Sequence, residues 1–129
     1  AVVLSIEARR ISPNSWSCFY ESGREDSGKS VLEWAAQASQ LGAGEVFVTS
    51  VDADGTKKGA DFDLAKALTN RINLPVMYSG GVRTPSEVAM LFKEAGVSAV
   101  TLASALHYGN FSVSDAKDAL SILSLSPRR

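Results

Sequence analysis

The clearest structural signal in this chain is the stretch Tyr78-Ser79-Gly80-Gly81-Val82-Arg83-Thr84-Pro85-Ser86-Glu87. An apolar run over residues 74–78 leads into it, and the two adjacent glycines predict a tight turn. Thr84-Pro85-Ser86-Glu87 then combines a capping residue, a proline and a glutamate in the order typical of a helix start. Adjacent glycines also let backbone N–H groups approach an anion closely. The stretch therefore indicates a strand, a turn and a helix, with either a plain glycine turn or an anion site between them.

The same strand-then-helix order recurs on both sides of this stretch. Apolar runs predict strands over residues 1–6, 45–50, 74–78 and 98–103. Each is followed by a helical apolar stripe, over residues 31–41, 62–72, 85–95 and 113–123. The first stripe opens with Ser30-Val31-Leu32-Glu33, the pattern of a capping box. Four β-α units with short turns favour parallel strands joined by right-handed helical crossovers.

Two architectures fit four such units. One is half of a (β/α)₈ barrel, whose typical length of about 250 residues is roughly twice that of this chain. The other is an open, doubly wound sheet. Residues 8–29 interrupt the pattern as a long polar connection, in which residues 16–20 are expected to form half of a small hairpin.

Composition limits the possible classes of function. A formal net charge of −1 and 45% hydrophobic residues predict one ordinary globular unit over residues 1–129, with neither a nucleic-acid nor a membrane surface. A single cysteine, Cys18, excludes an internal disulfide, and a single histidine, His107, disfavours a zinc site. No signal peptide is recognised, so a reducing cytoplasm is the expected location. Because the chain begins at Ala1 and not at methionine, we expect that a segment precedes it or that the chain is incomplete.

Candidate functional residues lie where the predicted strands end, since ligands bind at that edge in both architectures. Glu7 ends the first apolar run and is the best candidate for a general acid or base, with a solvated pair to Arg9 or Arg10 as the alternative. Gly80-Gly81 and Ser104-Ala105 suit a phosphate site. At least one of Asp52 and Asp54 is expected to form a turn before Gly55.

Other polar residues have simpler interpretations. Glu45 begins a strand, so it lies at the end of the sheet opposite these candidates and, taken alone, indicates a surface charge. His107 is expected to pack or cap locally, and Cys18 is expected to be inert.

Several motifs together resemble a known family. They are residues 2–7, residues 23–28, the run from Gly42 to Gly59 with its Asp-x-Asp-Gly-Thr pattern, the Ser79-Gly80-Gly81 turn and the Ala103-Ser104 pair. In these the chain is similar to the cyclase subunit of imidazole glycerol phosphate synthase, from histidine biosynthesis. The resemblance covers essentially the whole chain but only the C-terminal half of the family's barrel, strands five to eight.

The resemblance implies a (βα)₄ half-barrel with a loop or hairpin insertion after its first strand. It implies an ammonia-dependent cyclase/lyase reaction on a phosphorylated substrate, with a glutaminase subunit as partner and with neither a cofactor nor a metal. Carried over residue by residue, Glu7 stands where the family has its catalytic aspartate, and Glu45 matches the glutamate of the ammonia gate. The implied phosphate and substrate residues are Asp54, Gly55, Gly80, Gly81, Ala103 and Ser104.

Two other functions remain open. The related sugar-phosphate isomerase of the same pathway shares the Asp-Gly-Thr and Gly-Gly motifs. A non-catalytic, phosphate-binding half-barrel is favoured by the departure at Glu7 and by the absence of the family's second catalytic carboxylate, on strand one. Because half a barrel leaves strand edges and a lining face uncovered, we expect a homodimer or a pairing with an N-terminal half-barrel.

Overall fold

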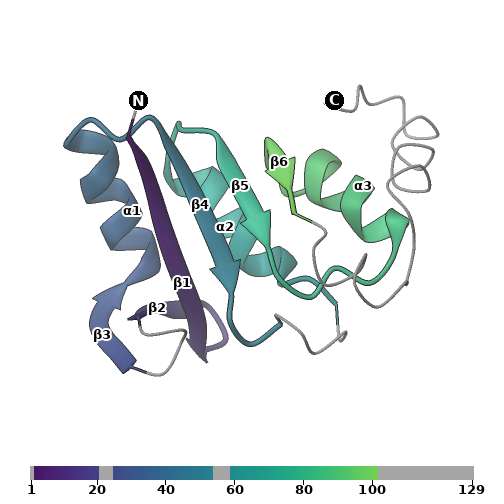
Figure 1. Cartoon of the computed structure of the whole chain (residues 1–129), viewed down its shortest axis with the longest axis horizontal. Helices are drawn as coiled ribbons and strands as arrows, with labels where there is room; N and C mark the ends of the chain where they lie inside the picture. Colours follow the sequence, from purple (N-terminus) through teal and green to yellow (C-terminus); the bar gives the residue numbers. More distant parts are fainter. Residues whose placement is uncertain (1, 21–24, 54–58, 102–129) are drawn as a thin grey trace.

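The chain folds around one mostly parallel sheet with helices against it (Figure 1). The computed structural model describes residues 2–20, 25–53 and 59–101. In their order across the sheet, the strands are β3 (Glu25–Ser30), β2 (Ser15–Tyr20), β1 (Val3–Ser12), β4 (Glu45–Ser50), β5 (Val76–Ser79) and β6 (Ala99–Val100). The helices are α1 (Val31–Gln40), α2 (Phe62–Arg71) and α3 (Pro85–Lys93).

The strands β1, β4, β5 and β6 are parallel, as the repeated strand-helix order predicts. Each described helix begins at a side chain that accepts a hydrogen bond from the backbone N–H three residues later, which satisfies one of the free donors of the first turn. The caps are Ser30 for α1, Asp61 for α2 and Thr84 for α3. The caps predicted at residues 30 and 84 are therefore confirmed.

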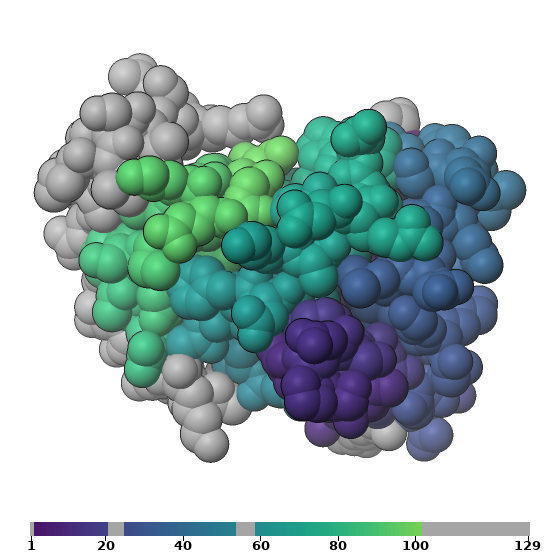
Figure 2. Space-filling model, turned by 180° about the vertical axis from the view of Figure 1, so that it is seen from behind, coloured from purple at the N-terminus to yellow at the C-terminus, as the bar shows by residue number. Residues whose placement is uncertain are grey.

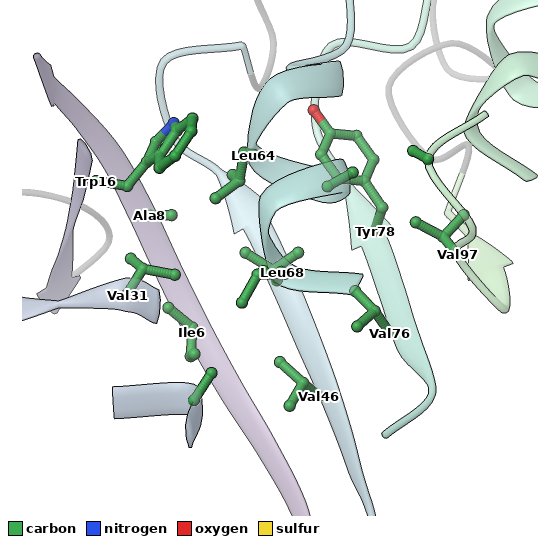
Figure 3. Packing of buried hydrophobic residues seen from close by; sticks show 14 of the residues in the cluster. Ile6, Ala8, Trp16, Val31, Val46, Leu64, Leu68, Val76, Tyr78 and Val97 are labelled. Atoms are coloured by element: carbon green, nitrogen blue, oxygen red, sulfur yellow. The ribbon is translucent and has the colours of Figure 1, made fainter. Parts of the chain in front are cut away.

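One apolar core lies between the sheet and the helices (Figure 3). It takes alternate residues from each central strand, because successive side chains of a strand point to opposite faces. Its members include Ile6 and Ala8 of β1, Val46 and Val48 of β4, Val76 and Tyr78 of β5, and residues of all three helices. In the view of Figure 2 the teal surface of α2 lies between α1 in blue and α3 in green.

This one-sided layer distinguishes the two predicted architectures. A doubly wound sheet carries helices on both faces, whereas the buried residues of α1, α2 and α3 belong to the same cluster on one face. The fold is therefore a partial (β/α)₈ barrel, as expected from the family resemblance, and the opposite face corresponds to the barrel interior.

The first strand is longer than predicted. It does not end at Ile6 but continues through Glu7 to Ser12, because its second half pairs antiparallel with β2. This hairpin confirms the strand expected at residues 16–20. A third antiparallel strand, β3, lies within the connection that the sequence indicated only as polar. The end of the fourth predicted strand, the last helix and His107 lie outside the described residues.

Candidate active site

A polar row crosses the helix-free face of the sheet. The strand register aligns Glu7 of β1 with Thr49 of β4, and Thr49 with Ser79 of β5. Strands are spaced about 4.8 Å apart, so Glu7 and Ser79 are separated by roughly 10 Å across the sheet. The next row on this face, one layer toward the strand starts, contains Ser5, Phe47 and Met77.

Glu7 borders a hollow of about 450 Å³ on this face. The lining residues are Ser5, Ile6, Glu7, Phe19, Tyr20, Phe47 and Thr49. Glu7 is half-buried and shares the hollow with aromatic residues of both the parallel sheet and the β2 hairpin strand. The Arg10 guanidinium, one of the two expected alternative partners of Glu7, pairs with Asp61 and Asp63 instead.

Two loops meet beside this row through their backbones. One joins β4 to α2 and the other joins β5 to α3. A Cβ on Gly81, whose φ is +73°, would lie 2.5 Å from the carbonyl oxygen of Gly59 and 2.6 Å from the Cβ of Ala53. A Cβ on Gly80, whose φ is +121°, would lie 2.7 Å from the carbonyl oxygen of Ser50. Both positions therefore require glycine, because any side chain would separate the loops.

The Tyr78 hydroxyl also joins these two loops. It accepts a hydrogen bond from the Asp61 N–H at 2.7 Å and donates one to the Gly80 carbonyl oxygen at 2.8 Å. The side chain is fully buried, and desolvation raises the pKa of the hydroxyl far above its ordinary value. The group therefore stays protonated, so it can both donate and accept.

Glu87 fixes the start of α3 in a second way. Its buried carboxylate accepts hydrogen bonds from the Arg83 backbone N–H at 2.9 Å and from the Arg83 Nε at 3.1 Å. The Arg83 guanidinium lies against Gly59, 3.3 Å from where a Cβ would stand. This ion pair thus holds the β5–α3 loop against the end of the β4–α2 loop.

A second cluster anchors the β4–α2 loop to the hairpin. Asp61 accepts hydrogen bonds from Arg10 Nη2 at 2.7 Å and from Trp16 Nε1 at 2.9 Å, and it also caps α2. The Arg10 guanidinium lies 4.8 Å from the centre of the Trp16 ring, in cation–π contact. At the other end of the loop, Asp52 accepts a hydrogen bond from the Arg10 N–H at 2.6 Å.

Sequence reasoning did not find this cluster or the role of Tyr78. The partners lie far apart in the chain, 42 residues for Asp52 with Arg10 and 51 for Asp61 with Arg10. No local spacing pattern links such residues. The one signal available in the sequence is that Asp61 directly precedes a helical stripe, a position where aspartate commonly caps a helix.

The structure places only some of the predicted site residues. Glu7 lies on the polar row, and Gly80 and Gly81 follow Ser79 at the end of that row. Glu45 is the first residue of β4 and pairs with Val3, at the opposite end of the sheet, as expected. The predicted site residues Asp54, Gly55, Ala103 and Ser104 lie outside the described residues.

Residues 2–20, 25–53 and 59–101 contain no group of three metal-ligating side chains close enough to hold an ion. No helix within these ranges is long and apolar enough to span a membrane.

Comparison with known proteins gives a consistent result. The family model described as "Histidine biosynthesis protein" matches residues 1–112. The imidazole glycerol phosphate synthase subunit HisF of Streptococcus gordonii is 35% identical over 98% of this chain and 50% of its own length. The HisF subunits of Synechococcus sp. and Dehalococcoides mccartyi are 41% and 40% identical, over 92% and 90% of this chain and 48% and 46% of their own lengths. The chain thus spans about half the length of the curated relatives it matches.

Proposed function

The chain belongs to the histidine biosynthesis protein family, and we propose that it provides one half of a HisF-type active site. The proposed reaction is the ammonia-dependent cyclase/lyase step of imidazole glycerol phosphate synthase. The observation that carries the proposal is the polar row of Glu7, Thr49 and Ser79 on the helix-free face, which runs into the Gly80-Gly81 turn.

Glu7 is the proposed general acid–base of this half. Glu7 lines a hollow of about 450 Å³, is half-buried and is aligned with the hydroxyl-bearing Thr49 of the neighbouring strand. A carboxylate in this position can take a proton from a reacting nitrogen or carbon and return it. Compared with the family's aspartate, glutamate carries one more methylene group, and a misplacement of about 1 Å can slow a reaction about 100-fold. We therefore expect turnover that is slow but dependent on Glu7.

The two glycines are the proposed phosphate-binding residues within the described chain. Backbone N–H groups at a glycine turn just before a helix start suit an anion, because the helix dipole adds positive potential there. The Thr84 cap begins α3 three residues after Gly81. We propose that Asp54, Gly55, Ala103 and Ser104 complete this phosphate and substrate site.

Glu45 is the proposed gate residue for ammonia. It lies at the strand starts, at the opposite end of the sheet from the phosphate-binding turn. Ammonia that enters there from a glutaminase partner would travel along the helix-free face, past the row of Ser5, Phe47 and Met77, to reach Glu7. That face is the interior of a complete barrel, so we propose that a second copy or an N-terminal half-barrel covers it. The mass of the chain in solution, measured by light scattering, tests self-association: a dimer is expected, and a stable compact monomer argues against it.

The activity test supplies the missing half. The chain is mixed with the N-terminal half-barrel of a HisF protein, and ammonia-dependent formation of imidazole glycerol phosphate is measured. We expect turnover that Glu7→Gln abolishes, whereas Glu94→Gln, an exposed glutamate just after α3, leaves it unchanged. Equal turnover of the Glu7 variant would remove Glu7 from the mechanism. Phosphate binding without any turnover would indicate the non-catalytic half-barrel instead.

A further inference from the structure

We propose that Tyr78 is a positioning residue that sets the direction of the Gly81 N–H in the phosphate site. The inference rests on the proposed function, because it takes the Gly80-Gly81 turn as the phosphate-binding element. It assigns a role to a core tyrosine that is not one of the proposed ligand-binding residues.

The hydroxyl holds the carbonyl group of Gly80. The O–H of Tyr78 donates to this oxygen at 2.8 Å, and its own oxygen is fixed by the Asp61 N–H at 2.7 Å. The ring is fully buried between the sheet and the helices, so the hydroxyl has little freedom to move (Figure 3). The direction of the Gly80 carbonyl is therefore set from inside the core.

The direction of the carbonyl determines the direction of the next N–H. The peptide bond between Gly80 and Gly81 is planar and trans, as are all peptide bonds described here. In a trans peptide the C=O and the N–H point in opposite directions. Because Tyr78 draws the Gly80 carbonyl toward itself, the Gly81 N–H points away from the tyrosine hydroxyl.

This peptide needs an external restraint. A peptide unit flips by changing ψ of the residue before it and φ of the residue after it, and here both residues are glycine. The φ of Gly81 is +73°, and glycine adopts the mirror-image value about as readily. No Cβ on Gly80 restricts the change in ψ of that residue. The glycine pair thus permits close loop contact but does not by itself fix the peptide direction. The buried Tyr78 hydroxyl favours one direction of this peptide, because it donates a hydrogen bond to the Gly80 carbonyl oxygen.

The test compares Tyr78→Phe with the unchanged chain in a titration with inorganic phosphate, followed by NMR of the Gly80 and Gly81 amides. Phenylalanine keeps the ring and removes the hydroxyl that holds the Gly80 carbonyl. We expect phosphate to bind the variant about five- to tenfold more weakly, the range given by one lost hydrogen bond. The control is Val76→Ala, which removes buried methyl groups two residues earlier on the same face of β5 and leaves the Tyr78 hydroxyl, with its hydrogen bonds to Asp61 and Gly80, in place.

The outcomes separate this inference from the proposed function. If the unchanged chain shows no phosphate response at Gly80 and Gly81, the phosphate site itself is refuted, and the role of Tyr78 with it. If the unchanged chain responds and Tyr78→Phe binds phosphate equally tightly, only the role of Tyr78 is refuted. A loss of affinity of the same size in Val76→Ala would mean that general loosening of the core is responsible, which also refutes the positioning role.

If Tyr78→Phe does not fold, a measurement on the unchanged chain tests the positioning role of Tyr78. Coupling between two sites is reciprocal, so phosphate held by the Gly81 N–H must stabilise the hydroxyl bridge. Hydrogen exchange of the Asp61 N–H, which donates to Tyr78, should then slow about five- to tenfold at saturating phosphate. Unchanged exchange at Asp61, with phosphate bound at Gly81, would overturn the inference.

Discussion

The contact between the two loops at Gly81 can be tested by adding one methyl group. In Gly81→Ala the new Cβ would stand 2.5 Å from the Gly59 carbonyl oxygen, 2.6 Å from the Ala53 Cβ and 2.8 Å from the Ala53 carbonyl oxygen. None of these atoms belongs to the far end of a flexible side chain. The loops must therefore separate before alanine fits.

The expected loss has two components. An L-residue at a φ of +73° costs about 1–2 kcal/mol, partly offset by a gain of about 0.4–1 kcal/mol because alanine restricts the unfolded chain. Overpacking against rigid neighbours adds about 1–3 kcal/mol. We therefore expect Gly81→Ala to lower the free energy of unfolding by about 2–4 kcal/mol.

A second glycine separates the two components. Gly96 has a φ of +75°, almost the same as Gly81, but a Cβ there would find its nearest neighbour, the Thr69 hydroxyl oxygen, at an ordinary 3.6 Å. Gly96→Ala should therefore show only the backbone component, about 1 kcal/mol. Urea unfolding followed by tryptophan fluorescence measures both variants. With a denaturant slope of about 1.5 kcal/mol/M, the midpoint of Gly81→Ala should fall by about 1–3 M.

The comparison can refute the argument directly. If Gly81→Ala and Gly96→Ala lower the midpoint equally, the β5–α3 loop does not press on the β4–α2 loop. In that case Gly81 would be needed only for its positive φ, and the backbone contact would contribute nothing to the proposed phosphate site.

Two further predictions concern Asp61 and Cys18. Asp61→Ala removes the α2 cap, the ion pair with Arg10 and the hydrogen bond from Trp16, so we expect the free energy of unfolding, measured in urea, to fall by about 2–4 kcal/mol. Asp63→Ala removes an exposed carboxylate 3.4 Å from the same Arg10 and should change this free energy by less than about 0.5 kcal/mol, so equal losses in the two variants would contradict the role of Asp61. Burial raises the pKa of the Cys18 thiol to about 11, so the thiolate fraction at pH 8, and with it the rate of iodoacetamide alkylation, should be about 100-fold lower than in the urea-unfolded chain. Alkylation of the folded chain should rise steeply with pH up to about 11, whereas equal rates in the folded and unfolded chains would contradict this burial.

Much of the local structure could be predicted from sequence because its causes are local. The caps at Ser30 and Thr84 each bond within three residues, and the apolar run that predicts β4 lies within six residues. The order of strands and helices follows from such signals alone. The position of Gly80-Gly81 after a strand and before a helix follows from them as well.

The predicted end of β1 was wrong because local sequence signals do not determine the length of a strand. Glu7 looked like the end of a strand because the apolar run stops at Ile6. The strand continues to Ser12 because β2 supplies hydrogen-bonding partners, and an antiparallel pair tolerates a polar sequence that a buried parallel strand does not. Pairing with a neighbour, and not apolar character, determines where this strand ends.

What the sequence alone determined is the set of elements, their order and the glycine turn, since each depends on residues within a few positions of one another. Only the tertiary structure decided that α1, α2 and α3 share one face, that Asp61 joins Arg10 and Trp16, and that Tyr78 holds the Gly80 carbonyl. Part of the reason is that these contacts join segments up to 51 residues apart. For Tyr78 the two residues are close in sequence, but the direction of the hydroxyl is fixed by Asp61, 17 residues away. Periodicity and spacing carry no information about such long-range contacts, because the contacts form only when the whole sheet packs against its helices.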